Sequence, residues 1–262
     1  MPVRKLNSME LVVRAWALLD QDTSVAAANE VRKLADDALR LEPTLVPAQL
    51  TVIYGLDSLN NVDPNPDRDR YAREKDEYSA RAVTLDPDNP DAWDQRAAAL
   101  MRLGRWNASL EASERQLKLD PYAVRSYDTR AWLLNMMGRP AEALPLIEKA
   151  QTLNPSDAGG ILRTACEALL LLGEVDKAIP TCERASGLDT GDFVLHLFLA
   201  AAYANSGDIE HANDALTTVL KTVPGYTIAQ LRAKRFSDHP EYQKLAEKYW
   251  YDGLRKAGLA EK

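Results

Sequence analysis

Apolar residues recur every three or four positions along most of the chain, the spacing that places them on one face of an α-helix. Polar breaks divide this pattern into successive helices, and no stretch alternates convincingly as a strand does. A lone amphipathic helix cannot bury its apolar face. The pattern therefore predicts an all-α protein whose helices pack against one another.

Glycines divide the helical runs between residues 90 and 224 at a nearly constant interval. They stand at Gly104, Gly138, Gly173 and Gly207, separated by 34, 35 and 34 residues. Five positions after each glycine, the second run carries a small residue: Ser109, Ala143, Ala178 and Ala212. Three of the four units close on a proline: Pro121, Pro155 and Pro224.

Each of these residue types has a structural reason at its position. Glycine ends the first helix because the chain must reverse within a few residues, sometimes at positive φ. A small residue lets the second helix press closely on the first. Proline cannot continue a helix, so it closes one unit and opens the next.

This period and pattern resemble the tetratricopeptide repeat (TPR), in which helix pairs stack into a continuous core. The resemblance implies an all-α, right-handed TPR-type solenoid of about six helix pairs over residues 1–225, with C-terminal capping helices over 226–262. The expected units lie near 8–43, 44–87, 90–121, 124–155, 159–190 and 193–224.

An insertion at 60–67 interrupts the second unit. Asp63, Asn65, Asp67, Asp69 and Glu74 mimic the ligand spacing of an EF-hand calcium loop. Arg68, however, stands where that loop needs glycine, and clustered Asx and proline residues are ordinary turn chemistry. A solvated loop without a metal is the expectation.

The chain after Pro224 departs from the repeat and predicts two further helices. The second carries an apolar stripe of Tyr242, Leu245, Tyr249 and Leu254, and we expect it to cover the last repeat. The stretches 224–233 and 251–259 resemble the C-terminal TPR module of bacterial class III adenylate/guanylate cyclases and related regulators. That resemblance implies a regulatory role in bacteria.

Charge and composition narrow the classes of partner. The net charge of -7 argues against nucleic acid and against an anionic membrane surface as partners. No apolar run approaches the roughly 20 residues of a membrane span. Glu10, Arg14 and Asp20 interrupt the N-terminal apolar stretch, which is therefore a poor signal peptide, and a cytoplasmic location is expected.

The two cysteines, Cys166 and Cys182, both fall in the fifth unit, at small or buried repeat positions. We expect two reduced core cysteines, because free cysteine is commonly buried. A disulfide is the alternative by proximity, although the cytosol disfavours it. Neither cysteine has the neighbours of a zinc site.

Catalytic and cofactor motifs are missing from the sequence. The three histidines are scattered without metal-ligand spacing, and there is no GxSxG, no P-loop and no GxGxxG after a strand. We therefore expect neither an enzyme nor a cofactor.

The TPR resemblance implies a concave groove lined by the first helix of each unit. Its positions fall on Tyr54, Arg125, Asp128, Trp132, Asn135, Arg163, Glu167 and Leu170. Two guanidinium groups and a tryptophan suit an extended peptide with an acidic residue, so a protein or peptide partner is expected. The alternatives are a small-molecule or signal sensor and a self-association element that makes a homo-oligomer.

Overall fold

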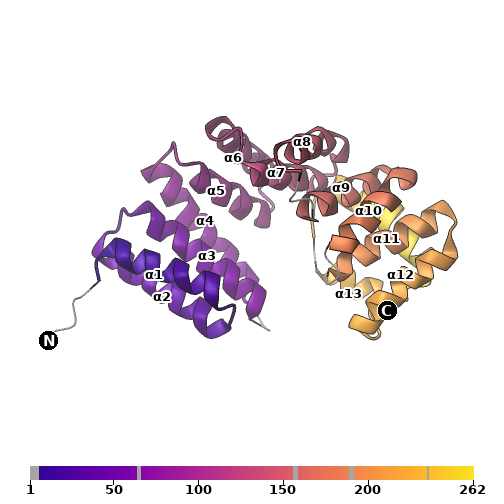
Figure 1. The fold of residues 1–262 in the computed structure, drawn as a ribbon, viewed down its shortest axis with the longest axis horizontal. Coiled ribbons are helices and arrows are strands. Elements are labelled where there is room, and N and C mark those ends of the chain that lie inside the picture. The colour runs from indigo at the N-terminus through magenta and orange to yellow at the C-terminus, as the bar shows by residue number, and fades with distance from the viewer. Residues whose placement is uncertain (1–5, 64–65, 156–158, 189–191, 235) are drawn as a thin grey trace. The chain divides into compact units, whose positions relative to one another are not determined.

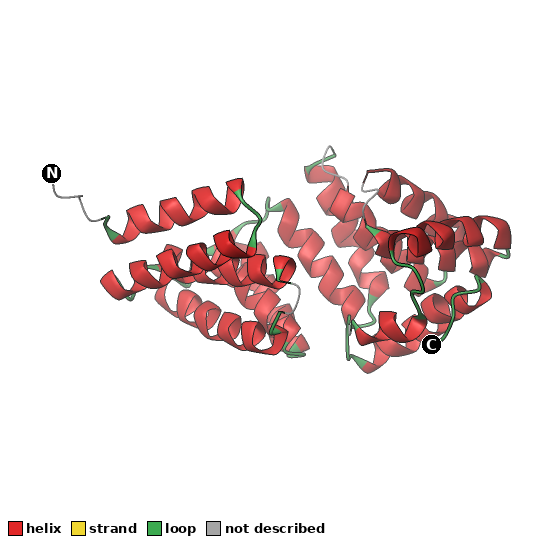
Figure 2. Ribbon diagram, turned by 90° about the horizontal axis from the view of Figure 1, so that it is seen from below, coloured by secondary structure: helices red, strands yellow, loops and turns green. Residues whose placement is uncertain are grey.

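A computed structural model of the 262-residue chain describes residues 6–63, 66–155, 159–188, 192–234 and 236–262. Throughout these ranges the regular elements are helices, and no strand occurs among them (Figure 2). Residues 1–121 and 122–262 form two compact units, and each is described here by itself.

The first unit consists of three helix pairs (Figure 1). Each helix packs against the next along the chain, and α1, α3 and α5 also touch in series. The pairs are α1 (Ser8–Gln21) with α2 (Val25–Leu41), α3 (Val46–Val62) with α4 (Arg68–Leu85), and α5 (Pro90–Arg102) with α6 (Trp106–Leu119).

The second unit repeats this arrangement and adds a helical tail. Its pairs are α7 (Val124–Met136) with α8 (Pro140–Leu153), α9 (Gly159–Leu172) with α10 (Val175–Leu188), and α11 (Phe193–Ser206) with α12 (Ile209–Thr222). The tail consists of α13 (Ile228–Ala233), α14 (Pro240–Leu245), a π-helical turn η1 (Ala246–Tyr251) and α15 (Asp252–Lys256). Each of the six pairs lies within one of the ranges expected from the sequence.

The repeat residues have the structural roles that the pattern predicts. The four periodic glycines all have positive φ, between 67° and 92°. The small residues that follow them, Ser109, Ala143, Ala178 and Ala212, are at most 1% exposed. Ser109 shows why a small side chain is needed, because its hydroxyl donates to the Ala97 carbonyl of the neighbouring helix at 2.7 Å. The two helices of the third pair therefore touch almost backbone to backbone.

Helix capping explains the two polar stretches at the N-terminus and at the insertion. Asn7 caps α1 in a reciprocal capping box with Glu10. Asp67 caps α4 by accepting from the Arg70 N–H. Asn65 of the calcium-like pattern lies outside the described residues, and no group of metal-ligating side chains gathers among those described.

None of the described helices combines the length and the hydropathy needed to cross a bilayer.

Candidate functional site

The C-terminal segment, defined here as residues 237–259, lies along the first helices of the second unit (Figure 1). Its helical part contacts α9 and α11, and its start reaches the end of α7. We call the surface that these three helices present to it the first-helix face. The sequence analysis expects this segment to cover the last repeat. Its contacts with α11 lie in that repeat, and those with α9 and α7 extend to the two repeats before it.

The segment begins at the C-terminal end of α7. Ser237 is buried, and its hydroxyl donates to the Met136 carbonyl at 2.6 Å. Beside it, a Cβ on Gly138 would lie 2.6 Å from backbone atoms of Glu241 and Tyr242. Gly138 therefore has two functions, because its positive φ ends α7 and its missing side chain admits the segment.

The middle of the segment packs on α9. Tyr242 is fully buried, and its hydroxyl lies 3.5 Å from Glu167 Oε1. Directly after the end of α9, a Cβ on Gly173 would lie 2.5 Å from the Tyr249 ring. Two repeat glycines thus admit the segment at two places.

The end of the segment packs on α11. Trp250 is fully buried, with its ring 4.7 Å from that of Phe198. A Cβ on Gly253 would come within 2.7 Å of the Ala201 carbonyl oxygen, and Asn205 Nδ2 donates to the Tyr249 carbonyl at 2.6 Å. These contacts are as close as those inside a domain core.

The buried stripe of the segment differs from the one expected. Tyr242 and Leu254 are buried as predicted, whereas Leu245 and Tyr249 are half-exposed. Between Tyr242 and Leu254 the buried residues are Ala246, Trp250, Tyr251 and Gly253, of which the first three lie within the π-helical turn. A turn with i→i+5 hydrogen bonds shifts the angular register, so within this turn Trp250 is buried in place of the predicted Tyr249.

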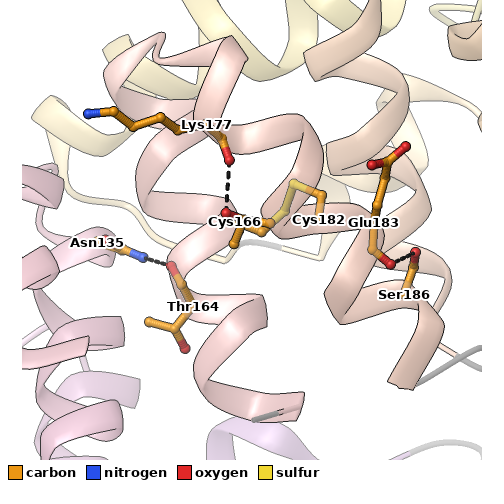
Figure 3. Close-up of a disulfide and its surroundings, with 8 residues drawn as sticks. Asn135, Thr164, Cys166, Lys177, Cys182, Glu183 and Ser186 are labelled. Atoms are coloured by element: carbon orange, nitrogen blue, oxygen red, sulfur yellow. Dashed lines mark hydrogen bonds between the residues drawn. A yellow bond between two sulfur atoms is a disulfide. The ribbon is translucent and has the colours of Figure 1, made fainter. Parts of the chain in front are cut away.

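Three of the predicted groove residues are buried and closed to a partner. Asn135, Glu167 and Leu170 are at most 4% exposed. Asn135 Nδ2 donates to the Thr164 carbonyl at 3.0 Å (Figure 3) and lies 3.5 Å from Glu167 Oε2. The adjacent first helices therefore bring these side chains together as expected, but Tyr242 of the C-terminal segment already contacts Glu167.

The remaining predicted residues are more accessible. Arg125 is exposed, and Asp128 and Trp132 are half-exposed on the same helix, α7. Arg163 Nε lies 2.7 Å from Asp192 Oδ2, so this guanidinium already has a carboxylate partner within the chain. Tyr54 is half-exposed on α3 of the first unit.

Burial dominates the electrostatics of this face. Loss of solvent raises the pKa of Glu167 to about 7, and the nearby Arg163 charge and the hydrogen bonds from Asn135 and Tyr242 offset this only in part. Burial also raises the pKa of Tyr242 well above its usual value. Glu167 is thus a buried carboxyl that changes charge near neutral pH.

The two cysteines form a disulfide, which corrects the expectation of reduced thiols. Cys166 of α9 and Cys182 of α10 are both fully buried, with an S–S distance of 2.05 Å (Figure 3). The repeat register places them at facing positions of one helix pair, with Cα atoms 5.0 Å apart. Burial statistics predict a buried cysteine but do not distinguish a thiol from a bonded pair.

The disulfide predicts a specific labelling result. In denaturant without reductant, neither cysteine should react with iodoacetamide, and after reduction both should react. The Cys166→Ala, Cys182→Ala double variant should unfold with about 3 kcal/mol less free energy, because the sequence separation is 16 residues. Two labels in denaturant before reduction would show that the thiols are free.

The sequence analysis did not identify Trp250 and Gly253 as contact residues of this face. Trp250 lies outside the stripe derived from ideal helix spacing, and Gly253 has no repeat position to mark it. The available signal was the run of large aromatic residues at 249–251, which is unusual on a helix expected to have a charged outer face.

The first unit contains a separate hollow of about 490 Å³. It is lined by Pro43, Gln49, Ala80, Arg81, Thr84 and Leu85. This hollow is one feature of the described residues to which the small-molecule alternative would apply.

The chain resembles known proteins in its three-dimensional structure. No protein-family model matches the chain, and no curated protein matches it. Among solved structures, PilF of Pseudomonas aeruginosa is similar at 14% identity with a TM-score of 0.64, over 92% of this chain and 97% of that one.

Two further structures carry the repeat in their description. A tetratricopeptide repeat protein from Parabacteroides merdae matches at 14% identity and a TM-score of 0.60, over 95% of this chain and 98% of that one. The TPR protein TTC0263 of Thermus thermophilus matches at 21% identity and a TM-score of 0.56, over 77% of this chain and 99% of that one. Together with the paired helices, these likenesses show that the chain has the all-α fold of tetratricopeptide repeat proteins.

Proposed function

We propose that this protein is a non-catalytic interaction module that binds a segment of another protein on its first helices. One observation carries the proposal: the first-helix face of the second unit already holds a helical segment of its own chain. That segment buries Tyr242 and Trp250 completely. A face that fits an aromatic-rich helix in this way has the chemistry of a polypeptide-binding surface.

The accessible part of the predicted groove lies on α7. Trp132 offers an aromatic surface, and Arg125 offers a guanidinium that can bind a carboxylate with two parallel hydrogen bonds. This combination favours a peptide with an acidic residue near an apolar one. Arg163, by contrast, is ion-paired to Asp192, so its removal would disturb the chain itself.

The test replaces Arg125 and Trp132 with alanine and measures partner capture against wild type. Each substitution should weaken binding by about 1–4 kcal/mol if it removes a hot spot. Lys149→Ala is the matched control, because Lys149 is exposed on α8 of the same unit. Equal capture by the double variant, at an unchanged melting temperature, would place the interface elsewhere.

The proposal includes an association with bacterial cyclases or related regulators. Its support is that the two stretches that carry the resemblance lie together in space. The Arg232 guanidinium of the first stretch lies 4.2 Å from the ring centroid of Tyr251 in the second. The N–H groups of Ile228 and Ala229, at the start of α13, donate to the carbonyls of Ala260 and Glu261, which directly follow the second stretch, at 2.9 and 3.0 Å. If the chain shares this module with the cyclases and regulators, we expect the module to need the pairing of these two stretches to close its C-terminal end.

The cellular compartment needs revision in the light of the disulfide. The cytoplasmic expectation rested on the poor signal peptide. A buried Cys166–Cys182 bond favours an oxidising compartment instead. The labelling experiment above, performed on protein extracted from its native host under acid quench, distinguishes the two.

Self-association is the alternative function favoured by a specific surface. Four apolar residues at or before α1 form an exposed stripe at helical spacing: Leu6, Met9, Val13 and Trp16. Such a stripe could join two copies of the chain. The mass of the protein in solution separates this alternative from binding of a different partner.

A further inference from the structure

The interface between the C-terminal segment and the first-helix face contains polar groups that it does not fully satisfy. Within the described ranges, the Trp250 indole N–H has no hydrogen-bond acceptor, although the side chain is fully buried. Asn135 Oδ1 is likewise buried without a donor. Buried polar atoms without partners cost free energy, and the π-helical turn that holds Trp250 is a further irregularity. Extensive apolar packing therefore holds the segment on the face, and the polar groups without partners reduce the favourable free energy of this docking.

Glu167 lies at the centre of this interface. Asn135 faces it from α7, Arg163 from its own helix α9, and Tyr242 from α14. Arg163 is shared with Asp192, so its charge neutralises the Glu167 carboxylate only in part. Neither arginine nor a buried tyrosine changes charge between pH 5 and 8, which leaves Glu167 as the group that titrates among those facing one another here.

We propose that the C-terminal segment is a releasable occupant of the first-helix face, and that ionisation of Glu167 is the switch that loosens it. When the carboxyl is protonated, it is neutral and tolerates burial under Tyr242. When it ionises, the docked segment covers a charge that Arg163, Asn135 and Tyr242 stabilise only in part, and that water stabilises better once the segment is released.

The direction of the pH effect follows from the two states of Glu167. In the docked state burial raises its pKa to about 7, whereas in the released state the exposed carboxyl has the ordinary value of 4.5. The docked state therefore binds the proton more tightly, and docking is strongest at low pH. The segment loosens as pH rises from the released value through about 7, and the effect levels off above that.

The segment also indicates what could replace it. It contacts the face through Tyr242 and Trp250, two helical turns apart, followed by a glycine at 253 where the backbone meets Ala201. A competing partner would be an amphipathic helix with the same aromatic spacing. This part of the inference rests on the proposed function, whereas release of the segment does not.

Hydrogen–deuterium exchange of the full chain tests the release directly. The opening constant of residues 242–257, corrected for intrinsic exchange, should rise roughly 50- to 100-fold between pH 5 and pH 8 in the wild type. Glu167→Gln keeps the shape and the hydrogen-bonding capacity of the side chain but removes the titration. Its opening constant should be nearly flat over this range, and helices of the first unit serve as the internal reference.

Two results would overturn the proposal. One is a wild-type opening constant that does not change with pH. The other is equal pH dependence in Glu167→Gln, which would show that another group causes the effect. If that variant fails to fold, the ¹³C titration of the Glu167 carboxyl in the wild type takes its place. The proposal requires the midpoint of this titration to coincide with the pH at which the opening constant changes, and a different midpoint would overturn it.

Because exchange needs no partner, the experiment separates the two proposals. Release without any bound partner would support the switch and leave the interaction role to the capture experiment. Capture that depends on Arg125 and Trp132, with a segment that never opens, would support the interaction role and refute the switch.

Discussion

Replacing Trp250 with alanine should destabilise the second unit by about 3–5 kcal/mol. The indole is fully buried between Phe198, at 4.7 Å between ring centroids, and Phe236, at 5.4 Å. Removing it deletes the largest fully buried side chain among the described residues and leaves a cavity at the segment interface. Urea denaturation followed by far-ultraviolet circular dichroism measures the loss.

A matched substitution shows whether the loss of stability comes from removing a buried side chain or from removing any aromatic ring. Tyr122 is 77% exposed in the same unit, so Tyr122→Ala should change the free energy of unfolding by about 0.5 kcal/mol or less. If Trp250→Ala costs no more than Tyr122→Ala, Trp250 is not buried and the segment does not pack on α11.

The second large effect is expected at Gly138. Gly138→Ala should cost roughly 1–2 kcal/mol for an alanine at positive φ, plus about 1–3 kcal/mol because its Cβ collides with the backbone of Glu241 and Tyr242. Backbone atoms cannot swing aside as a flexible side chain can. The segment must therefore shift away from α7 or the turn must distort.

Gly207 provides the control for this experiment. It ends α11 with φ 92°, in the same conformational class, but a Cβ there would meet nothing within 4 Å. Gly207→Ala should thus carry only the conformational cost. Equal losses in the two variants, measured by thermal denaturation, would mean that the C-terminal segment does not approach Gly138.

The fold was predictable because its signals are local and repeated. Glycine at positive φ, a small residue five positions later and proline at the close recur at a fixed interval, and each acts within one helix pair. The first residue of α1 was harder to predict, because Asn7 and Ser8 are both good capping residues. Only the geometry shows that Asn7 is the cap.

The site was predictable only in part because its decisive contacts are distant along the chain. The repeat register places Asn135 and Glu167 on first helices of adjacent pairs, where their side chains lie 3.5 Å apart. It contains no information on Tyr242, which reaches Glu167 from 75 residues away. The π-helical turn and the disulfide are likewise settled by tertiary packing, which a periodic pattern does not encode.

The central claim is that the C-terminal segment lies on the first-helix face of the second unit, and proton NMR tests it most directly. The Trp250 and Phe198 rings, with centroids 4.7 Å apart, should give strong nuclear Overhauser effects in the wild-type protein. Because the chain has only three phenylalanines, Trp250→Ala and Phe198→Leu suffice to assign the cross-peaks. Cross-peaks that vanish in both variants are the predicted result. A Trp250 ring with random-coil shifts and no contact to Phe198 would contradict the account.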